Sequence, residues 1–210
     1  MIRLLFIALL LSFQPVSAQR ELDIEFDQDE LKDRYEINVL RFYLMSLQFH
    51  VSGCEWYAEE NSVHLIDLED ASSWKIQLPK EFGKSSIDSI SFLIGVDSTT
   101  NVAGILDGDL DPIKGMYWAW NSGYINFKVE GKKLDSETKF EYHLGGYLPP
   151  FSTARRVSLA RNPQKKRMTL RLELKQFLDE LDMKELTEVM IPGEEAVLLS
   201  DQLSNRFSFD

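Results

Sequence analysis

Residues 106–130 read LDGDLDPIKGMYWAWNSGYINFKVE. The end of this stretch alternates, with Ile125, Phe127 and Val129 on one side of the chain and polar residues on the other. A period of two is typical of a half-buried β-strand. Trp118 and Trp120, two of the four tryptophans, precede the strand. If the backbone is extended, both indoles point to the same face.

An acidic turn leads into the Trp pair and contains Asp107, Asp109 and Asp111. Asp, Pro and Gly are the usual residues of tight turns, and large indoles are mostly buried, so a structural role is one interpretation of the whole stretch. The Asp-x-Asp-x-Asp spacing also resembles half of a calcium loop. However, Pro112 interrupts it, and the glycine and the glutamate of an EF-hand loop are missing.

The rest of the chain alternates in the same way. A charged connection near residue 30 and turn residues such as Pro79 and Gly145 separate the alternating stretches. Strands are expected at residues 22–26, 38–51 (bulged near Met45 and Ser46), 63–68, 74–78, 87–96, 139–144, 157–159 and 168–174, besides the strand after the Trp pair. No strand–helix repeats occur, so this pattern predicts an all-β fold, an antiparallel β-sandwich of about eight strands.

Two further segments complete the expected fold. Residues 97–115 form a connection that is long for a compact domain, which suggests a functional loop packed at one end of the sandwich. After Pro192 and Gly193, the apolar residues Val197, Leu198, Leu203 and Phe207 suit one face of a short C-terminal helix.

The N-terminus has the features of a secretory signal peptide. Arg3 is followed by an apolar run at residues 4–13 and by the small-residue cleavage site Val16-Ser17-Ala18. We expect residues 1–18 to be removed and residues 19–210 to form a single domain that is periplasmic or secreted. The mature chain is expected to contain no membrane span, because the apolar run is too short for one.

Composition excludes some functions. The formal net charge is −11, so binding to nucleic acid or to an anionic membrane is not expected. Acidity does suit a protein that meets cations. Cys54 is the only cysteine, which rules out an internal disulfide. It is either a small buried hydrophobe or a copper thiolate ligand.

The three histidines are His50, His64 and His143, and each could be structural or a metal ligand. His143 alternates with Phe140, Tyr142 and Leu144, and His64 alternates with Val63 and Leu65. Both imidazoles are therefore expected on the outer side or the rim of their strands, where they could converge on one copper or zinc ion. Two histidines alone are an incomplete site unless the ion is Cu(I).

Several stretches resemble the periplasmic MbnP-like family: RFYLMSL, NSVHLID, ISFLIGVD, DGDLDP with GMYWAWNSGYINFKVEG, and FEYHLGGY. The resemblance implies a copper-binding β-sandwich linked to methanobactin operons. It also implies a di-haem partner, related to cytochrome c peroxidases, that oxidises a tryptophan to kynurenine. By this resemblance Trp118 or Trp120 would be the modified residue and His64 and His143 the copper ligands, with His50 a weaker candidate.

Two other functions remain open from the sequence. One is a calcium-stabilised or glycan-binding β-sandwich module without a redox metal, which would use the acidic turn or the exposed aromatic residues. The other is an enzyme. No Ser-His-Asp motif, phosphate-binding glycine loop or HExxH motif is present in the sequence, so we expect a protein that is not an enzyme.

The signal peptide gives a first prediction. Protein purified from its native host should have an intact mass that corresponds to a chain starting at or near Gln19. A mass that retains residues 4–13 would instead show an uncleaved membrane anchor.

Overall fold

The computed structural model describes residues 20–52, 56–82, 86–121, 123–165 and 167–210. The expected signal peptide, its cleavage site before Gln19, and Cys54 lie outside these residues.

Strands dominate the described chain, and short helices connect them. The strands are β1 (Glu21–Phe26), β2 (Tyr35–Val51), β3 (Trp56–Ala58), β4 (Val63–Asp67), β5 (Lys75–Gln77), β6 (Ile87–Ile94), β7 (Tyr117–Trp118), β8 (Gly123–Lys133), β9 (Thr138–Gly145), β10 (Arg155–Ala160), β11 (Thr169–Leu172), β12 (Glu188–Val189) and β13 (Phe207–Phe209). The α-helices are α1 (Gln28–Leu31), α2 (Ser98–Ala103), α3 (Leu174–Asp179) and α4 (Glu194–Ser204). The 3₁₀ turns are η1 (Ala71–Trp74), η2 (Lys80–Phe82), η3 (Gly108–Leu110) and η4 (Pro112–Lys114).

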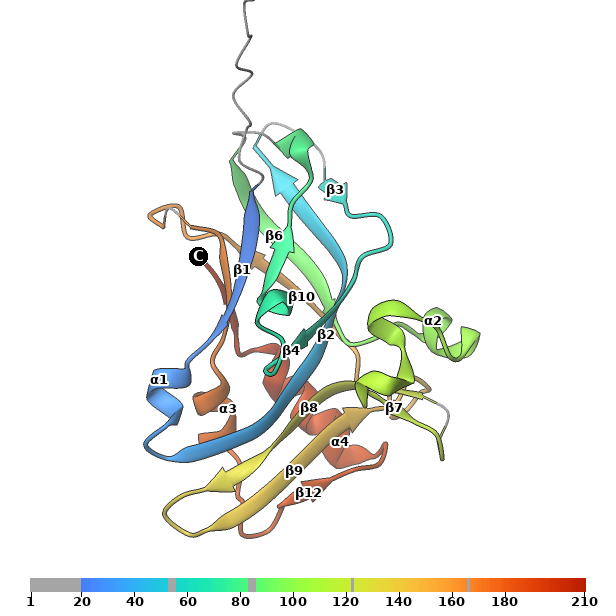
Figure 1. Ribbon diagram of the computed structural model, residues 1–210, viewed down its shortest axis with the longest axis vertical. Coiled ribbons are helices and arrows are strands. Elements are labelled where there is room, and N and C mark those ends of the chain that lie inside the picture. The colour runs from blue at the N-terminus through green and yellow to red at the C-terminus, as the bar shows by residue number, and fades with distance from the viewer. Residues whose placement is uncertain (1–19, 53–55, 83–85, 122, 166) are drawn as a thin grey trace, which may run out of the picture.

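The strands form two sheets, and the larger one curls strongly around the core (Figure 1). The smaller sheet has the order β13-β11-β1-β5, and the larger follows the path β10-β6-β2-β8-β9-β12 with β3, β4 and β7 attached beside it. The expected mainly β fold is confirmed. The expectation of antiparallel pairing throughout is wrong, because β1 pairs with β11 and β12 pairs with β9 in parallel. More strands are present than the eight expected, since several pair over only two or three residues.

Strand β2 is the centre of the larger sheet and is paired along both edges. One edge pairs with β8 and then with β6, and the other pairs with β4 and then with β3. The expected bulge is confirmed: the register with β6 shifts between Met45 and Gln48, and Ser46 has a φ of 53°. A bulge bends a strand and strengthens its twist, which helps the sheet to curl.

Both faces of the larger sheet carry apolar residues. The inner face packs on the smaller sheet and on α3 and α4, and this main core includes Leu44, Phe42 and Phe127. A second group of residues, here called the outer cluster, covers part of the opposite face. Its buried members are Tyr43, Met45, Leu65, Val96, Leu110, Met116, Trp118, Tyr124 and Ile125.

Two details of the predicted alternation are wrong. Ile125 belongs to the outer cluster and Phe127 to the main core, because a register shift between them changes which face each residue occupies. The C-terminal helix α4 is present, but it buries Ala196, Leu199 and Leu203, whereas Leu198 is 57% exposed. Phe207 lies beyond the helix, in β13.

No helix in the described ranges combines the length and the apolar character that crossing a membrane requires.

Asn126 occupies the register shift in β8 and is buried. Its Oδ1 accepts a hydrogen bond from the Val96 N–H, and its Nδ2 donates one to Thr153 Oγ1. We predict that Asn126→Ala lowers the free energy of unfolding by about 1–3 kcal/mol, because the Val96 N–H and the Thr153 hydroxyl lose buried partners. Urea unfolding measures this change. The exposed Lys139→Ala on β9 should alter stability by less than about 0.5 kcal/mol, and an equal loss in both variants would contradict the assignment.

Candidate functional site

The Trp pair lies where β7 meets β8, on the outer face of the larger sheet. Trp118 is 6% exposed and Trp120 is 64% exposed. Their ring centroids are 5.5 Å apart and the ring planes are inclined by 41°, so the two indoles are in contact, although Trp120 lies in the turn after β7 and not in an extended strand. Trp118 is therefore buried, and Trp120, which contacts it, is exposed to solvent.

Trp118 packs directly on the backbone of β9. A Cβ added at Gly145 would lie 2.5 Å from the Trp118 ring, closer than atoms can approach. Gly145 pairs with Ile125, another member of the outer cluster. Because Gly145 has no side chain, the buried Trp118 ring can pack against this position.

The segment that precedes the Trp pair is fastened to β2 and β4. Tyr43 donates a hydrogen bond to the Asp109 carbonyl, and Leu65 N–H donates one to Asp109 Oδ2. Arg41 donates to Asp67, to Glu69 and to the Lys114 carbonyl, at 2.8, 2.6 and 3.2 Å. Gly115 then turns the chain at a φ of 71° towards β7. These bonds fix the direction in which the chain enters the Trp pair.

The acidic turn has a structural function in this arrangement. Asp109 binds the edge of β4, and Asp111 Oδ1 accepts a hydrogen bond from Ile113 N–H at the start of η4. Asp107 precedes η3 without a side-chain cap bond. Among the described residues, no group of three or more His, Cys, Asp or Glu side chains is placed to hold a metal ion.

His143 lies on the outer face, as its alternation predicts, but it is buried rather than exposed. It pairs with Lys128 across β8 and β9, and its Nε2 is 2.8 Å from Glu130 Oε1. Burial lowers the pKa of His143, and the hydrogen bond to Glu130 opposes this only in part. Since residues 143 and 145 share a face of β9, His143 lies beside the glycine on which Trp118 packs.

His64 lies on the opposite face of the sheet. It pairs with Leu44, a main-core residue, whereas Val63 and Leu65 point to the outer cluster. Its Nε2 is 2.8 Å from Glu59 Oε2, which also accepts a hydrogen bond from Ser62. Burial alone would raise the pKa of Glu59, but the bonds from His64 and Ser62 outweigh it and lower the pKa.

The structure therefore does not bring His64 and His143 together. Strands β2 and β8 lie between β4 and β9, so the two backbones are three strand spacings apart, about 14 Å. The inference that both histidines face outwards is wrong for His64, because Val63 and Leu65 face the outer cluster, whereas His64 shares the other face of β4 with the main-core residue Ile66. His50 lies near the far end of β2, 3.8 Å from Asp88 and in contact with the Trp56 ring.

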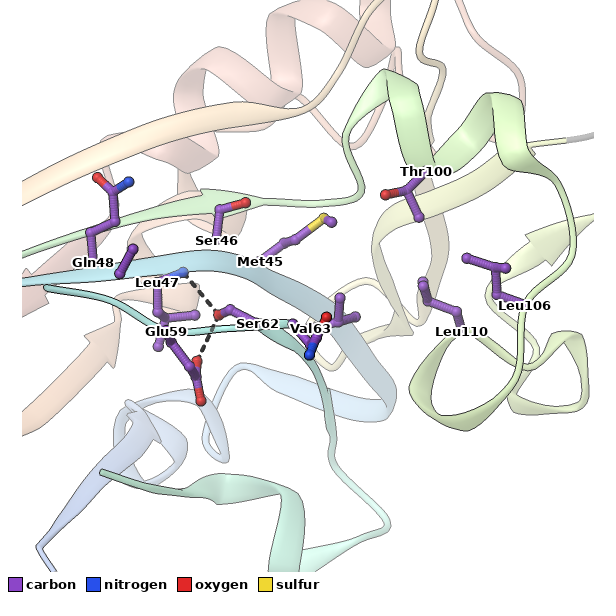
Figure 2. A pocket seen from close by; sticks show the side chains of 12 residues that line it. Met45, Ser46, Leu47, Gln48, Glu59, Ser62, Val63, Thr100, Leu106 and Leu110 are labelled. Carbon is purple, nitrogen blue, oxygen red and sulfur yellow. Dashed lines mark hydrogen bonds between the residues drawn. The ribbon is translucent and has the colours of Figure 1, made fainter. Parts of the chain in front are cut away.

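Two cavities border this region. A polar cavity of about 200 Å³ at the edge of β4 is lined by His64 together with Asp67, Asp70, Asp109 and Lys114, among others. A larger one, of about 470 Å³, lies between the bulge of β2 and the segment with α2 and η3 (Figure 2). Met45, Glu59 and Thr100 are among its lining residues, and Ser62 links Leu47 N–H to Glu59 at its wall. This cavity was not predicted from the sequence, although the bulge near Ser46 and the unusual length of residues 97–115 are signals that could have indicated it.

These features define a β-rich domain whose larger sheet carries a contacting pair of buried and exposed indoles on its outer face. The sequence model of the MbnP family matches residues 7–191, so the chain belongs to the MbnP family. The predicted family is thereby confirmed. Among solved structures, MbnP from Methylosinus trichosporium is similar, with 12% sequence identity and a TM-score of 0.49 over 83% of this chain and 81% of that one. No curated protein matches the chain.

Arg41 provides a test of how the Trp pair is held. Arg41→Ala should destabilise the fold by about 1–2 kcal/mol, because Asp67 loses its half-buried partner and the Lys114 carbonyl loses a donor. The near-ultraviolet circular dichroism of the contacting indoles should change with it. Arg34→Ala, which removes the more exposed ion pair with Asp179, should cost less than about 0.5 kcal/mol and leave this signal intact. A destabilised Arg41→Ala protein with an unchanged indole signal would show that Arg41 does not hold the pair.

Proposed function

We propose that this chain is an exported copper-handling protein and not an enzyme, and that the Trp118–Trp120 pair with His143 forms its functional region. The observation that carries the proposal is membership of the MbnP family, whose resemblance implies copper binding and an oxidised tryptophan. The modification would be made by a di-haem, peroxidase-like partner that converts an indole to kynurenine.

The outer face supports this location. Trp118 is held by Gly145, Trp120 is open to a partner, and His143 lies two residues before Gly145 on the same face. Low pKa values keep an imidazole neutral, which is the form that binds metals. An acidic protein surface also attracts cations.

A copper ion shared by His64 and His143 does not fit the arrangement of these side chains. The two imidazoles occupy opposite faces, and each contacts its own glutamate. We therefore propose that copper binding depends on His143 and that the His64–Glu59 pair supports the turn between β3 and β4.

A glycan-binding module remains the alternative, and the exposed Trp120 ring is the feature that would serve it. Sugars stack on exposed aromatic rings, and such binding requires no metal. The calcium alternative receives no support from the acidic turn, whose carboxylates are not gathered.

Copper content separates these functions. In protein purified from its host with its genomic partner, His143→Ala should lose most of its bound copper, and His64→Ala should retain it if the protein stays folded. His50→Ala is the matched control, because His50 lies at the C-terminal end of β2, away from the Trp pair. Elemental analysis gives the copper, and mass spectrometry should find one tryptophan of the pair that has gained one oxygen and lost one carbon.

Three outcomes would count against the proposal. Equal copper loss in His64→Ala and His143→Ala would support a copper site shared by both histidines. Full copper retention in His143→Ala would place the ion elsewhere. Wild-type protein that binds oligosaccharides but no copper would favour the glycan-binding module.

A further inference from the structure

The two indoles differ sharply in exposure although they touch. Trp120 is 64% exposed, Trp118 is 6% exposed, and their centroids are 5.5 Å apart. Tryptophan is among the side chains that are most easily oxidised by one electron, and contact between aromatic rings gives strong electronic coupling. A large oxidant can therefore touch Trp120 but not the buried ring of Trp118, whose Cζ3 and Cη2 atoms lie next to Gly145.

We infer that Trp120 is an electron relay, through which a one-electron oxidant docked on the surface oxidises the buried Trp118. This inference rests on the proposed function in one respect, that the Trp pair is the oxidised element. It adds a direction: the exposed indole passes the oxidising equivalent on, and the buried indole keeps it.

The electron count is as follows. The oxidant, a high-potential metal centre, accepts one electron from Trp120, so the oxidation state of the metal centre falls by one. Trp118 then gives one electron to the Trp120 radical cation, which returns to its original state. The indole N–H proton of Trp118 passes to water, and a neutral radical remains on Trp118. The net change is one electron from Trp118 to the oxidant, and Trp120 is not consumed.

The surroundings of the pair favour this direction. Trp118 is enclosed by the outer cluster and only 6% exposed, so a radical on it is shielded from large molecules at the surface, whereas small molecules such as water and oxygen can still reach the ring. Trp120 has no such enclosure. The other described tryptophans are not arranged in this way. Trp56 is 49% exposed and contacts the ring of His50, while Trp74 packs on the rings of Phe26 and Phe42.

The test uses a bulky photo-oxidant in place of the natural partner. Tris(bipyridine)ruthenium is oxidised by light with a cobalt(III) pentaammine quencher in air-saturated buffer, and dissolved oxygen marks the indole that holds the radical. Fragment-ion mass spectrometry of the peptide that contains both indoles then locates the added oxygen. In the wild-type protein the label should appear mainly on Trp118 despite its burial.

Trp120→Phe distinguishes relay from simple shielding, because the two predict changes of opposite sign. A relay predicts that labelling of Trp118 is lost in this variant, since phenylalanine is not oxidised under these conditions. If Trp120 merely covers Trp118, its removal should increase the labelling of Trp118, and that result would overturn the inference, as would unchanged labelling. The matched control is Trp56→Phe, which removes another exposed indole and should leave Trp118 labelling at the wild-type level.

The experiment contains no added copper and no natural partner. Loss of Trp118 labelling in Trp120→Phe would support the relay even if the protein bound no copper. Conversely, a copper-loaded protein whose Trp118 is labelled normally without Trp120 would keep its proposed function and lose only the relay.

Discussion

The structure depends on the pairing of β2 along both edges and on the covering of both its faces. Backbone groups within a strand need partners, and apolar side chains on both faces need cover. The smaller sheet and the helices cover one face, and the segment from α2 to β7 covers part of the other. The β8-paired part of β2 ends at Phe42, and the bulge at Ser46 lies within the part that pairs with β6. The residues around the Trp pair are held in place because both faces of β2 are covered.

Much of the fold could be predicted because period-two alternation is a local property. The positions of β1, β6 and β9 followed from it, and β2 with its bulge followed from a long apolar and aromatic run. Parallel partners could not be predicted, since β1 and β11 are far apart in sequence and their pairing depends on the whole chain. Strands of two or three residues, such as β7 and β12, carry too few side chains for a recognisable pattern.

The site was predicted less completely, and β4 shows why. Alternation separates the two faces of a strand but does not say which face is the main core. On β9 the apolar residues face the core, so the inferred direction of His143 was right. On β4 the apolar Leu65 faces the outer cluster, so His64 points the other way. The spacing of Trp118 and Trp120 indicated a shared face only for an extended chain, but Trp120 lies in a turn, and the room that Gly145 leaves for Trp118 could not be read from the local sequence.

The Arg41 side chain joins three segments that are separate in sequence: β4 through Asp67, the turn after it through Glu69, and the acidic segment through the Lys114 carbonyl. Because one guanidinium bonds to all three segments, the effect of a substitution in one segment depends on the residues in the other two. Substitutions at Arg41 and Asp67 should combine non-additively, because the second removes a bond that the first has already broken. Sequence drift at these positions is therefore expected to be correlated, so that the acidic segment and the β4 turn evolve as one unit although more than forty residues separate them.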